Sequence, residues 1–465
     1  MQVHLKHKLT MLLVLLSLLI VSGSVVAQDE PVPVVPTADD LMKVNIIFVG
    51  AHPDDDSTST ATLARYALDE GAKTAVVTAT HGEGGGNSIG RQLGPSLGMV
   101  REAEERAALD MLGVAQIYYL NEEDWAFTTS ANAAEQFWGH DDPLGNLVRI
   151  FRVLKPDVVI TMNPSPGSGH GHHQYIAKLA TEAFVLAGDP NAFPEQLTDE
   201  FIDPWQPLKL YYALGYGGVG LQASLQIPTN EISPSQFTSY ADLELQALRM
   251  YRSQGFGGLA IPAAGRRLNP EIFMLAASML PIPEVETDML AGIRSGIDQA
   301  PAGVEMIVRA QNFYMAQGSE QPIDVTFRNT SDADLSGVSL SLSVPDGWTV
   351  SEAQSVGDLA AGAETMATFT VTVPQDADVT QFSRVVARFD ATDANGNARY
   401  ASKPGLVQVT PPVSAELQPI EAVQIYRDWA VRLGMEHIVP LASTEIALGA
   451  GGSGTIPVIL TNRSN

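Results

Sequence analysis

The sequence contains no cysteine among its 465 residues. This absence excludes a disulfide framework and a lipid-modified N-terminal cysteine, whatever compartment the protein occupies. It also restricts any metal site to histidine, aspartate and glutamate ligands.

Basic side chains are scarce as well. The chain carries 27 Lys and Arg residues against 53 Asp and Glu residues, for a net charge of −26 with histidine neutral. Such a field repels phosphate backbones and anionic membranes, so no nucleic-acid partner is expected. The simplest interpretation of the acidity is solubility.

The N-terminus has the pattern of a secretory signal peptide. Lys6 and Lys8 precede a long apolar run, and Val25 and Ala27 occupy the small-residue positions of a cleavage site. We therefore expect a signal peptide over residues 1–27, a proline-rich linker over 28–41, and a mature protein that is secreted or extracytoplasmic. The alternative is an uncleaved membrane anchor, because the run is nearly long enough to span a bilayer; with the signal cleaved, no membrane contact is expected.

Strand-like and helix-like segments then alternate along the chain. Four apolar runs, at 43–51, 72–80, 114–120 and 156–162, are separated or followed by helical patterns at 58–70, 99–112, 144–155 and 172–187. This order predicts an α/β domain over residues 42–298, with a Rossmann-like, mostly parallel sheet and helices on both faces. Ligands of such sheets lie beyond the carboxyl ends of the strands.

The pattern changes near residue 300. Period-two runs separated by turn residues predict an all-β, immunoglobulin-like sandwich over residues 299–412. The segment PDGWTV and its surroundings resemble the NEW3-type domains appended to bacterial glycan-acting enzymes, which implies an accessory role.

For residues 413–465 we expect a linker and the possible start of a second, truncated sandwich. The run beginning at Ile456 aligns without a gap to the run beginning at Ile323, as a repeated strand would. Either the sequence is a fragment or this tail is an edge strand of the first sandwich, and we favour the fragment.

The end of the first apolar run carries the first candidate site. The stretch AHPDDD places His52, Asp54 and Asp55 where a parallel sheet receives its ligand. Three adjacent carboxylates repel one another, and a bound divalent cation would remove that cost. A solvated acidic turn would leave both the repulsion and His52 unexplained.

A second group of metal-ligand side chains follows the fourth run. In GSGHGHH, His170 and His173 are three residues apart at a predicted helix start, so both can face the rim that carries His52. Histidine nitrogens and carboxylate oxygens are good Zn²⁺ ligands. Ligand type discriminates weakly among metals, so Fe²⁺ or another divalent ion is also compatible.

Six motifs in order resemble those of the PIG-L/LmbE family of zinc-dependent de-N-acetylases, which act on N-acetylglucosamine conjugates. They are His-Pro-Asp-Asp-Glu at 52–56, Thr-Xaa-Gly-Glu at 80–83, Arg-Xaa-Xaa-Glu at 101–104 followed by Leu-Gly-Val at 112–114, an aspartate at 124, His-Pro-Asp-His at 170–173 and Ser-Gln at 253–254. The resemblance implies that His52, Asp55 and His173 bind zinc. It also implies that Asp54 is the general base and that His170 polarises the carbonyl or stabilises the oxyanion.

The same resemblance implies that Arg101 and Asp124 bind the substrate; the alternative for each is a structural ion pair. The chain departs from the family pattern at three positions. Asp56 replaces a glutamate, Ser168 replaces a frequent tyrosine, and HGHH offers His172 as an alternative ligand. We prefer His173 because it keeps the family spacing.

Three hypotheses for function follow. The leading one is a secreted zinc-dependent hydrolase that removes the N-acetyl group from an N-acetylglucosamine-type sugar or glycan. A second keeps the metal site but cleaves another small amide, such as a thiol conjugate or an acylated metabolite. A third is a non-catalytic glycan- or surface-binding protein on a decayed scaffold. The oligomeric state leaves no trace in the sequence, and no role is predicted for His81, His140 or His437.

Overall fold

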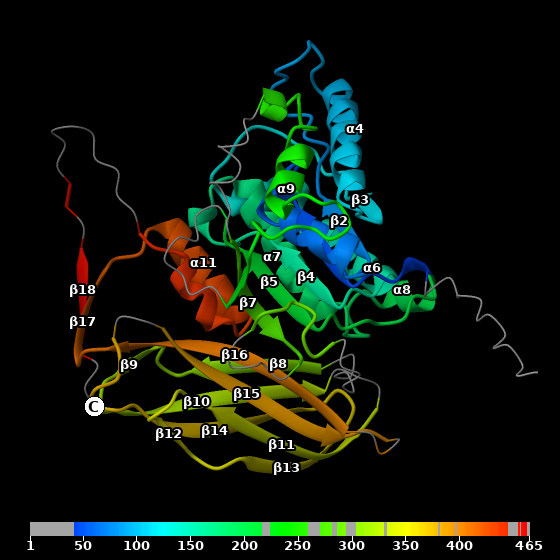
Figure 1. The fold of residues 1–465 in the computed structure, drawn as a ribbon. Helices are drawn as coiled ribbons and strands as arrows, with labels where there is room; N and C mark the ends of the chain where they lie inside the picture. Colours follow the sequence, from blue (N-terminus) through cyan, green and yellow to red (C-terminus); the bar gives the residue numbers. More distant parts are fainter. Residues whose placement is uncertain are drawn as a thin grey trace, which may run out of the picture. The chain divides into compact units, whose positions relative to one another are not determined.

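The computed structural model describes residues 41–215, 224–258, 270–280, 286–293, 304–329, 333–379, 382–394, 396, 398–444, 454–455 and 457–462. The predicted signal peptide and nearly all of the predicted proline-rich linker lie outside these ranges. Elements are labelled as in Figure 1.

The first part of the chain is organised around a seven-stranded sheet with the order β3-β2-β1-β4-β5-β7-β6 (Figure 1). Its strands are β1 (Ile46–Gly50), β2 (Thr74–Thr78), β3 (Gln116–Tyr119), β4 (Val158–Thr161), β5 (Lys209–Ala213), β6 (Leu225–Ile227) and β7 (Glu271–Ser278). Strands β3, β2, β1, β4 and β5 pair in parallel, whereas β7 is antiparallel to both β5 and β6. The predicted mostly parallel sheet is confirmed, and its four predicted strands are β1 to β4.

Helices cover both faces of this sheet, as predicted. They are α3 (Thr60–Ala64), α4 (Pro95–Met111), α5 (Ala131–Trp138), α6 (Asp141–Leu154), α7 (Gly171–Leu186), α8 (Pro194–Thr198) and α9 (Tyr240–Leu248), with the short turns η1 (Asp55–Thr58), η2 (Arg65–Asp69), η3 (Pro166–Ser168) and η4 (Phe256–Gly258). Alternate residues of β1 belong to different cores. Ile47 and Val49 pack with α5, α6 and α7, while Ile46 and Phe48 pack with α3, α4 and α9.

The second part consists of two β-sheets. Their strands are β8 (Val304–Ala310), β9 (Tyr314–Ala316), β10 (Glu320–Asn329), β11 (Leu335–Ser343), β12 (Thr349–Val350), β13 (Gln354–Leu359), β14 (Glu364–Thr372), β15 (Phe382–Thr392) and β16 (Ala398–Thr410). One sheet has the order β12-β14-β10-β8 and the other β13-β11-β15-β16-β9. Inward residues of both, such as Phe327 and Phe389, share one core, so the predicted sandwich is confirmed.

The segment after the sandwich corrects part of the sequence interpretation. The predicted linker contains the helix α11 (Glu421–Arg432) and the turn η5 (Glu436–Leu441), which the sequence analysis did not predict. Strand β18 (Val458–Asn462) pairs with β17 (Val413–Leu417) and not with either sheet of the sandwich. Within the described residues, the tail is therefore not an edge strand of the first sandwich.

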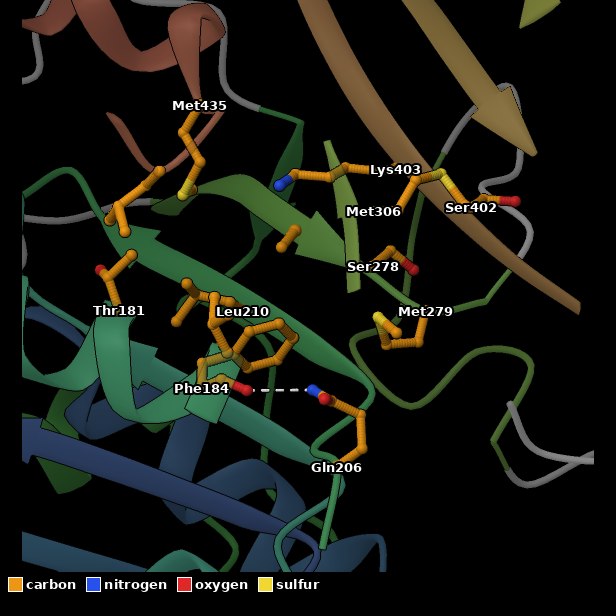
Figure 2. Close-up of a pocket in the computed structure, with 13 residues that line it drawn as sticks. Thr181, Phe184, Gln206, Leu210, Ser278, Met279, Met306, Ser402, Lys403 and Met435 are labelled. Atoms are coloured by element: carbon orange, nitrogen blue, oxygen red, sulfur yellow. Dashed lines mark hydrogen bonds between the residues drawn. The ribbon is translucent and has the colours of Figure 1, made fainter. Parts of the chain in front are cut away.

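A small cavity of about 30 Å³ lies among residues of α7, β5, β7, β8, β16 and the segment before η5 (Figure 2). Phe184, Leu210 and Met306 contribute much of its apolar lining, and Gln206 Nε2 donates a hydrogen bond to the Phe184 carbonyl. This volume has room for little more than one water molecule. None of its lining residues is a predicted site residue, so it is not a candidate substrate site.

Within the part of the chain that the structure describes, every helix is too short or too polar to cross a membrane.

Candidate metal centre and active site

The end of β1 holds the aspartates in a fixed turn. Asp55 Oδ2 accepts hydrogen bonds from the backbone N–H groups of Ala51, at 2.7 Å, and His52, at 2.9 Å. Asp54, which lies between His52 and Asp55 in the chain, has a φ of 110°. This left-handed conformation costs energy for any residue with a Cβ. The turn therefore directs Asp54 and Asp55 to different places.

The second group of histidines lies at the start of α7. His170 is the residue before the helix, and His172 and His173 are in its first turn. Since β1 and β4 are neighbours in the sheet and α7 follows β4, the two groups meet at the carboxyl edge of the strands. This is the edge where the sequence predicted them to meet.

The three predicted metal ligands lie close together. His52 Nδ1 lies 3.1 Å from His173 Nε2, His173 Nε2 lies 3.2 Å from Asp55 Oδ1, and His52 Nδ1 lies 3.7 Å from Asp55 Oδ2. Ligand atoms around a tetrahedral zinc, with bonds of about 2.0–2.1 Å, are separated by roughly 3.3 Å. The donor set and its spacing thus fit a divalent cation, as predicted for His52, Asp55 and His173.

The other ring nitrogen of His52, Nε2, faces two different side chains, those of His172 and Asp124. His52 Nε2 lies 3.2 Å from His172 Nδ1 and 3.6 Å from Asp124 Oδ1. A second possible ligand group, made of His52, His170 and His172, is therefore present. His172 is completely buried, whereas the His173 side chain is 22% exposed. Each group has one buried and two half-buried members, but only the His173 group of these two includes a carboxylate, that of Asp55, whose negative charge favours a cation. The His173 group is therefore the better candidate for a metal.

If His52 binds a metal through Nδ1, Asp124 is the carboxylate next to its other ring nitrogen. A ligating histidine usually gives its second N–H to a carboxylate, which fixes the ring. Asp124 also lies 3.6 Å from His172 Nδ1. Burial alone would raise the pKa of Asp124, but the hydrogen bonds to His172 and His52 hold it below its ordinary value. Asp124 therefore remains a carboxylate.

The electrostatics favour positive charge at the ligand group. Burial would lower the pKa of His52, but the carboxylates of Asp124 and Asp55 outweigh it and raise this pKa to about 10. Burial would raise the pKa of Asp55, but the charges and hydrogen bonds of His173 and His52 outweigh it and lower this pKa. The carboxylates thus stabilise a cation at this position.

Asp54 and His170 have the properties that their predicted roles need. Burial, followed by the charge of Asp55, raises the pKa of Asp54, which makes its carboxylate a better proton acceptor. Burial, followed by the nearby charge of His52, lowers the pKa of His170 to about 3. His170 is therefore a neutral imidazole, and its Nε2 has no hydrogen-bond partner among the described residues.

Asp56, the position that departs from the family pattern, is held by two hydroxyl groups. Tyr251 donates a hydrogen bond of 2.9 Å to Asp56 Oδ1, and Thr60 donates one of 3.2 Å to Oδ2. Asp56 is 2% exposed, and burial raises its pKa to about 6. The aspartate therefore links the start of α3 to Tyr251, one residue after the candidate ligand Asp55.

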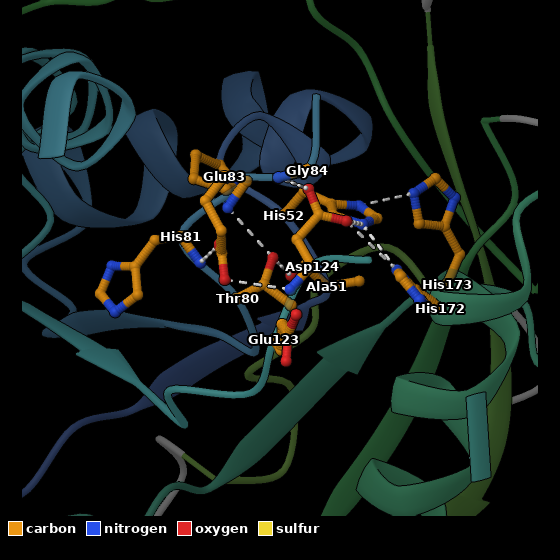
Figure 3. A network of polar contacts seen from close by, with 12 residues as sticks. Ala51, His52, Thr80, His81, Glu83, Gly84, Glu123, Asp124, His172 and His173 are labelled. Atoms are coloured by element: carbon orange, nitrogen blue, oxygen red, sulfur yellow. Dashed lines mark hydrogen bonds and ion pairs between the residues drawn. The ribbon is translucent and has the colours of Figure 1, made fainter. Parts of the chain in front are cut away.

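A loop after β2 connects the two sides of the site (Figure 3). Glu83 accepts hydrogen bonds from the backbone of His81 and of Asp124, each at 3.1 Å, and Gly84 N donates to Asp124 Oδ2 at 3.1 Å. A Cβ at Gly84 would lie 2.2 Å from the Asp124 carbonyl oxygen, so only glycine allows this approach. Thr80 adds a hydrogen bond to the Ala51 carbonyl at 2.9 Å.

Arg101 binds the same loop. Its guanidinium donates to the carbonyl oxygens of Gly82, at 2.7 Å, and Gly86, at 2.9 Å, and the residue is 6% exposed. The structure brings Arg101 and Asp124 to the site, where both already have partners within the chain. Their roles in binding a substrate stay predictions.

The remaining motif residues support the turn from outside. Glu104 accepts hydrogen bonds from the backbone and hydroxyl of Ser253, at 2.9 and 2.7 Å, and Gln254 donates to the carbonyl of Pro53. Glu271, on β7, accepts from the backbone N–H groups of Ala61 and Thr62 at the start of α3. The sequence carries no local signal for Glu271, because its partners are about two hundred residues away in the chain.

Aromatic residues on the loop after β3 were also missed. The ring of Phe127 stacks on His170 with a centroid distance of 4.7 Å, and His170 stacks on His52 at 4.9 Å. Trp125 and Trp138 pack against His172. A Trp-Ala-Phe sequence directly after Asp124 was the available signal.

Comparisons with known proteins agree with these geometric findings. Residues 47–184 match the family model described as GlcNAc-PI de-N-acetylase, or PIG-L, and residues 315–389 match the NPCBM-associated NEW3 domain of alpha-galactosidase. The chain is 34% identical over 188 residues to a 1D-myo-inositol 2-acetamido-2-deoxy-alpha-D-glucopyranoside deacetylase of Streptomyces avermitilis, which covers 37% of this chain and 62% of that protein.

A second curated relative, deacetylase 2 of the same description from Saccharopolyspora erythraea, is 36% identical over 180 residues, or 36% of this chain and 64% of that protein. The chain thus spans less than two thirds of the length of these two relatives. Among solved structures, the N,N'-diacetylchitobiose deacetylase of Pyrococcus horikoshii is similar, with 23% identity, a TM-score of 0.38 and coverage of 50% of this chain and 83% of that one. The match to the PIG-L model thus lies on the α/β part of the chain, and the match to the NEW3 model lies on the sandwich.

Proposed function

We propose that the chain is a secreted, zinc-dependent deacetylase that hydrolyses the acetamide of an N-acetylglucosamine-type sugar or glycan. The observation that carries this proposal is the convergence of His52 Nδ1, Asp55 and His173 Nε2 within 3.7 Å of one another, with Asp54 and His170 beside them.

The chemistry needs a metal because an amide is a poor electrophile at neutral pH. Bound at His52, Asp55 and His173, Zn²⁺ would lower the pKa of a water molecule and polarise the acetyl oxygen. Zinc has no redox chemistry and suits a set of imidazole and carboxylate ligands.

Two residues of the chain would handle the proton and the developing charge. Asp54, with its raised pKa, accepts a proton from the attacking water and passes it to the nitrogen of the leaving amine. As the C–N bond breaks, the products are acetate and a free amine. His170, a neutral imidazole, donates a hydrogen bond to the acyl oxygen as negative charge develops there.

The substrate class is supported by the relatives. Their names describe deacetylation of a 2-acetamido-2-deoxy-glucopyranoside, which is an N-acetylglucosamine unit. The secreted location is supported by the signal-like pattern of residues 1–27 alone.

The test is an assay of amine release by the chain from Gln28 onwards. The protein is stripped of metal with a chelator, reloaded with Zn²⁺, and incubated with N-acetylglucosamine and several of its glycosides. We expect zinc-dependent release of a primary amine. In Asp54→Asn, the rate should fall by about 10²- to 10⁴-fold while zinc content is unchanged.

Asp110→Asn is the matched control, because Asp110 is an exposed aspartate on α4. It should retain the full rate. The proposal fails if the zinc-loaded protein releases no amine from any acetylated sugar, or if Asp54→Asn is as active as the wild type.

A further inference from the structure

Two exposed aromatic rings lie next to the candidate active site. Phe127 is 74% exposed and Phe137 is 51% exposed, and the half-buried Trp125 contacts Phe137 with a centroid distance of 4.8 Å. We call Trp125, Phe127 and Phe137 the aromatic lip. Isolated exposed apolar residues are common, but a group beside a catalytic centre indicates a binding surface.

Phe127 is placed by the catalytic histidines. Its ring is almost parallel to that of His170, at 6°, and His170 is almost parallel to His52, at 11°. One face of Phe127 therefore covers His170, while the other is open to solvent. A ligand ring that stacks on the open face of Phe127 would be separated from His170, the residue proposed to contact the acyl oxygen, by the Phe127 ring alone.

The loop that carries Phe127 is fixed to the start of α7. Gly171 N donates a hydrogen bond of 2.6 Å to the Thr128 carbonyl, and Gln174 Nε2 donates one of 3.0 Å to the Thr129 carbonyl. A Cβ at Gly171 would lie 2.4 Å from the Ser130 carbonyl oxygen, so the glycine allows the loop to approach the helix. The lip is thus preorganised, which reduces the entropic cost of binding.

We propose that the aromatic lip, through the open face of Phe127, binds the sugar ring adjacent to the reacting N-acetyl sugar and determines how strongly a disaccharide is preferred over N-acetylglucosamine. This inference rests on the proposed function and specifies the substrate of the same site.

The occupant follows from the shape and charge of the lip. A pyranose ring has a face of C–H groups that packs on an aromatic ring, and its hydroxyl groups lie at the rim, where they stay in water. An alkyl chain would need a groove along its length to remove its surface from water, whereas Phe127 is 74% exposed and covers a ligand from one side alone. Glu122, Glu123 and Asp124 precede Trp125 on the loop and disfavour an anionic group next to the reacting sugar.

The experiment compares kcat/KM of the zinc-loaded chain on N-acetylglucosamine, N,N'-diacetylchitobiose and the octyl glycoside of N-acetylglucosamine. The wild type should prefer the disaccharide over the monosaccharide by about tenfold. Phe127→Ala should lose this preference, mainly through a rise in KM for the disaccharide that is larger than any change in KM for the monosaccharide. Phe127→Trp should retain the preference, and Phe201→Ala, which removes an exposed phenylalanine after α8, should change nothing.

Three results would overturn the inference: no preference in the wild type, an equal loss on both sugars in Phe127→Ala, or a Phe127-dependent preference that is larger for the octyl glycoside. The second result would mean that Phe127 only supports His170. The third would mean that the lip binds an alkyl chain.

If no sugar is turned over, the proposed function fails. A binding measurement then tests whether the aromatic lip binds a sugar. Saturation-transfer NMR with N,N'-diacetylchitobiose should then show binding that Phe127→Ala weakens by about tenfold. Binding that is absent, or equal in the two proteins, would overturn the inference about the lip independently.

Discussion

Asp54, Asp55 and Asp56 have three different environments. Asp54 has a strained backbone and a raised pKa, Asp55 is tied to the end of β1 and faces two histidines, and Asp56 is buried against Tyr251. The repulsion expected of three adjacent carboxylates is therefore reduced by separating them, and the remaining charge at Asp55 faces the candidate cation site.

The contact between Tyr251 and Asp56 should contribute measurably to stability. Tyr251→Phe removes the hydroxyl and leaves Asp56 Oδ1 buried without its 2.9 Å partner. We expect a loss of about 1 to 3 kcal/mol in the free energy of unfolding, because an unsatisfied buried polar group keeps its full desolvation cost. Denaturant unfolding measures the loss. Tyr118→Phe, which removes the half-buried hydroxyl that bonds to Gln116, is the control and should cost less; an equal cost would contradict the role given to Asp56.

His437 should make stability depend on pH. Burial, followed by the charge of Lys403, lowers its pKa from 6.5 to about 3, while Nε2 lies 2.8 Å from the Ala276 carbonyl oxygen. Arg384 also opposes protonation. Because the folded pKa lies below the unfolded one, the stabilisation is complete above pH 6.5. It is lost as the pH falls from 6.5 towards 3, by about 1.4 kcal/mol per pH unit.

The measurement is the free energy of unfolding of the wild type and of His437→Gln between pH 7 and pH 5. Glutamine keeps a donor for the Ala276 carbonyl but does not titrate. The difference between the two proteins should shrink or reverse as the pH falls. Parallel curves would show that His437 does not titrate as described.

The residues that carry the proposed chemistry could be predicted from the sequence because they occur in short motifs. His52 to Asp56 and His170 to His173 each follow a strand, and parallel strands bring their carboxyl ends together. Tyr251 and Glu271 could not be assigned in this way. Their partners Asp56, Ala61 and Thr62 are about two hundred residues away, and only the folded chain brings them together.

At the scale of elements, α11 is a helix that the composition of its segment did not predict. Val423, Tyr426 and Trp429 follow the three-residue spacing of a buried helix face, yet we predicted a linker there. Trp429 Nε1 donates a hydrogen bond of 2.9 Å to Glu182 on α7, and its ring lies 5.1 Å from Lys178 Nζ. The helix that follows the sandwich thus packs against the helix that carries the candidate ligand His173.

Removing this contact should destabilise the protein. Trp429 is 3% exposed, so Trp429→Ala should cost about 3 to 5 kcal/mol of unfolding free energy. Val431→Ala, on the exposed side of the same helix, is the control and should stay within about 0.5 kcal/mol of the wild type. Thermal unfolding followed by circular dichroism compares the three proteins. Equal stability of the two variants would show that α11 does not pack on α7.

The strands of the sheet were predictable to different degrees. Strands β1, β2 and β4 are buried at every residue and read as apolar runs. Strand β5 begins with Lys209, which is 1% exposed and bonds to Glu286 Oε1 at 2.9 Å. A buried ion pair formed by a residue of another segment cannot be read from the local pattern, and β5 was missed.

At the scale of the whole molecule, the signal-like pattern of residues 1–27 predicts a defined N-terminus for the mature protein. If the chain is expressed with its own N-terminus in a secreting bacterium, the mature protein should begin at Gln28, after the small residues Val25 and Ala27. Intact-mass measurement of the exported protein checks this. A membrane-bound product that retains Met1 would support the anchor instead.

The central claim is that His52, Asp55 and His173 hold the metal on which hydrolysis depends. The most direct test is the zinc content per chain, measured by elemental analysis together with amine release, for the wild type, His173→Ala and His172→Gln. The account predicts one zinc ion per chain in the wild type and in His172→Gln, and loss of both zinc and activity in His173→Ala. Retention of zinc in His173→Ala together with its loss in His172→Gln would contradict it and would move the metal to the buried side of His52.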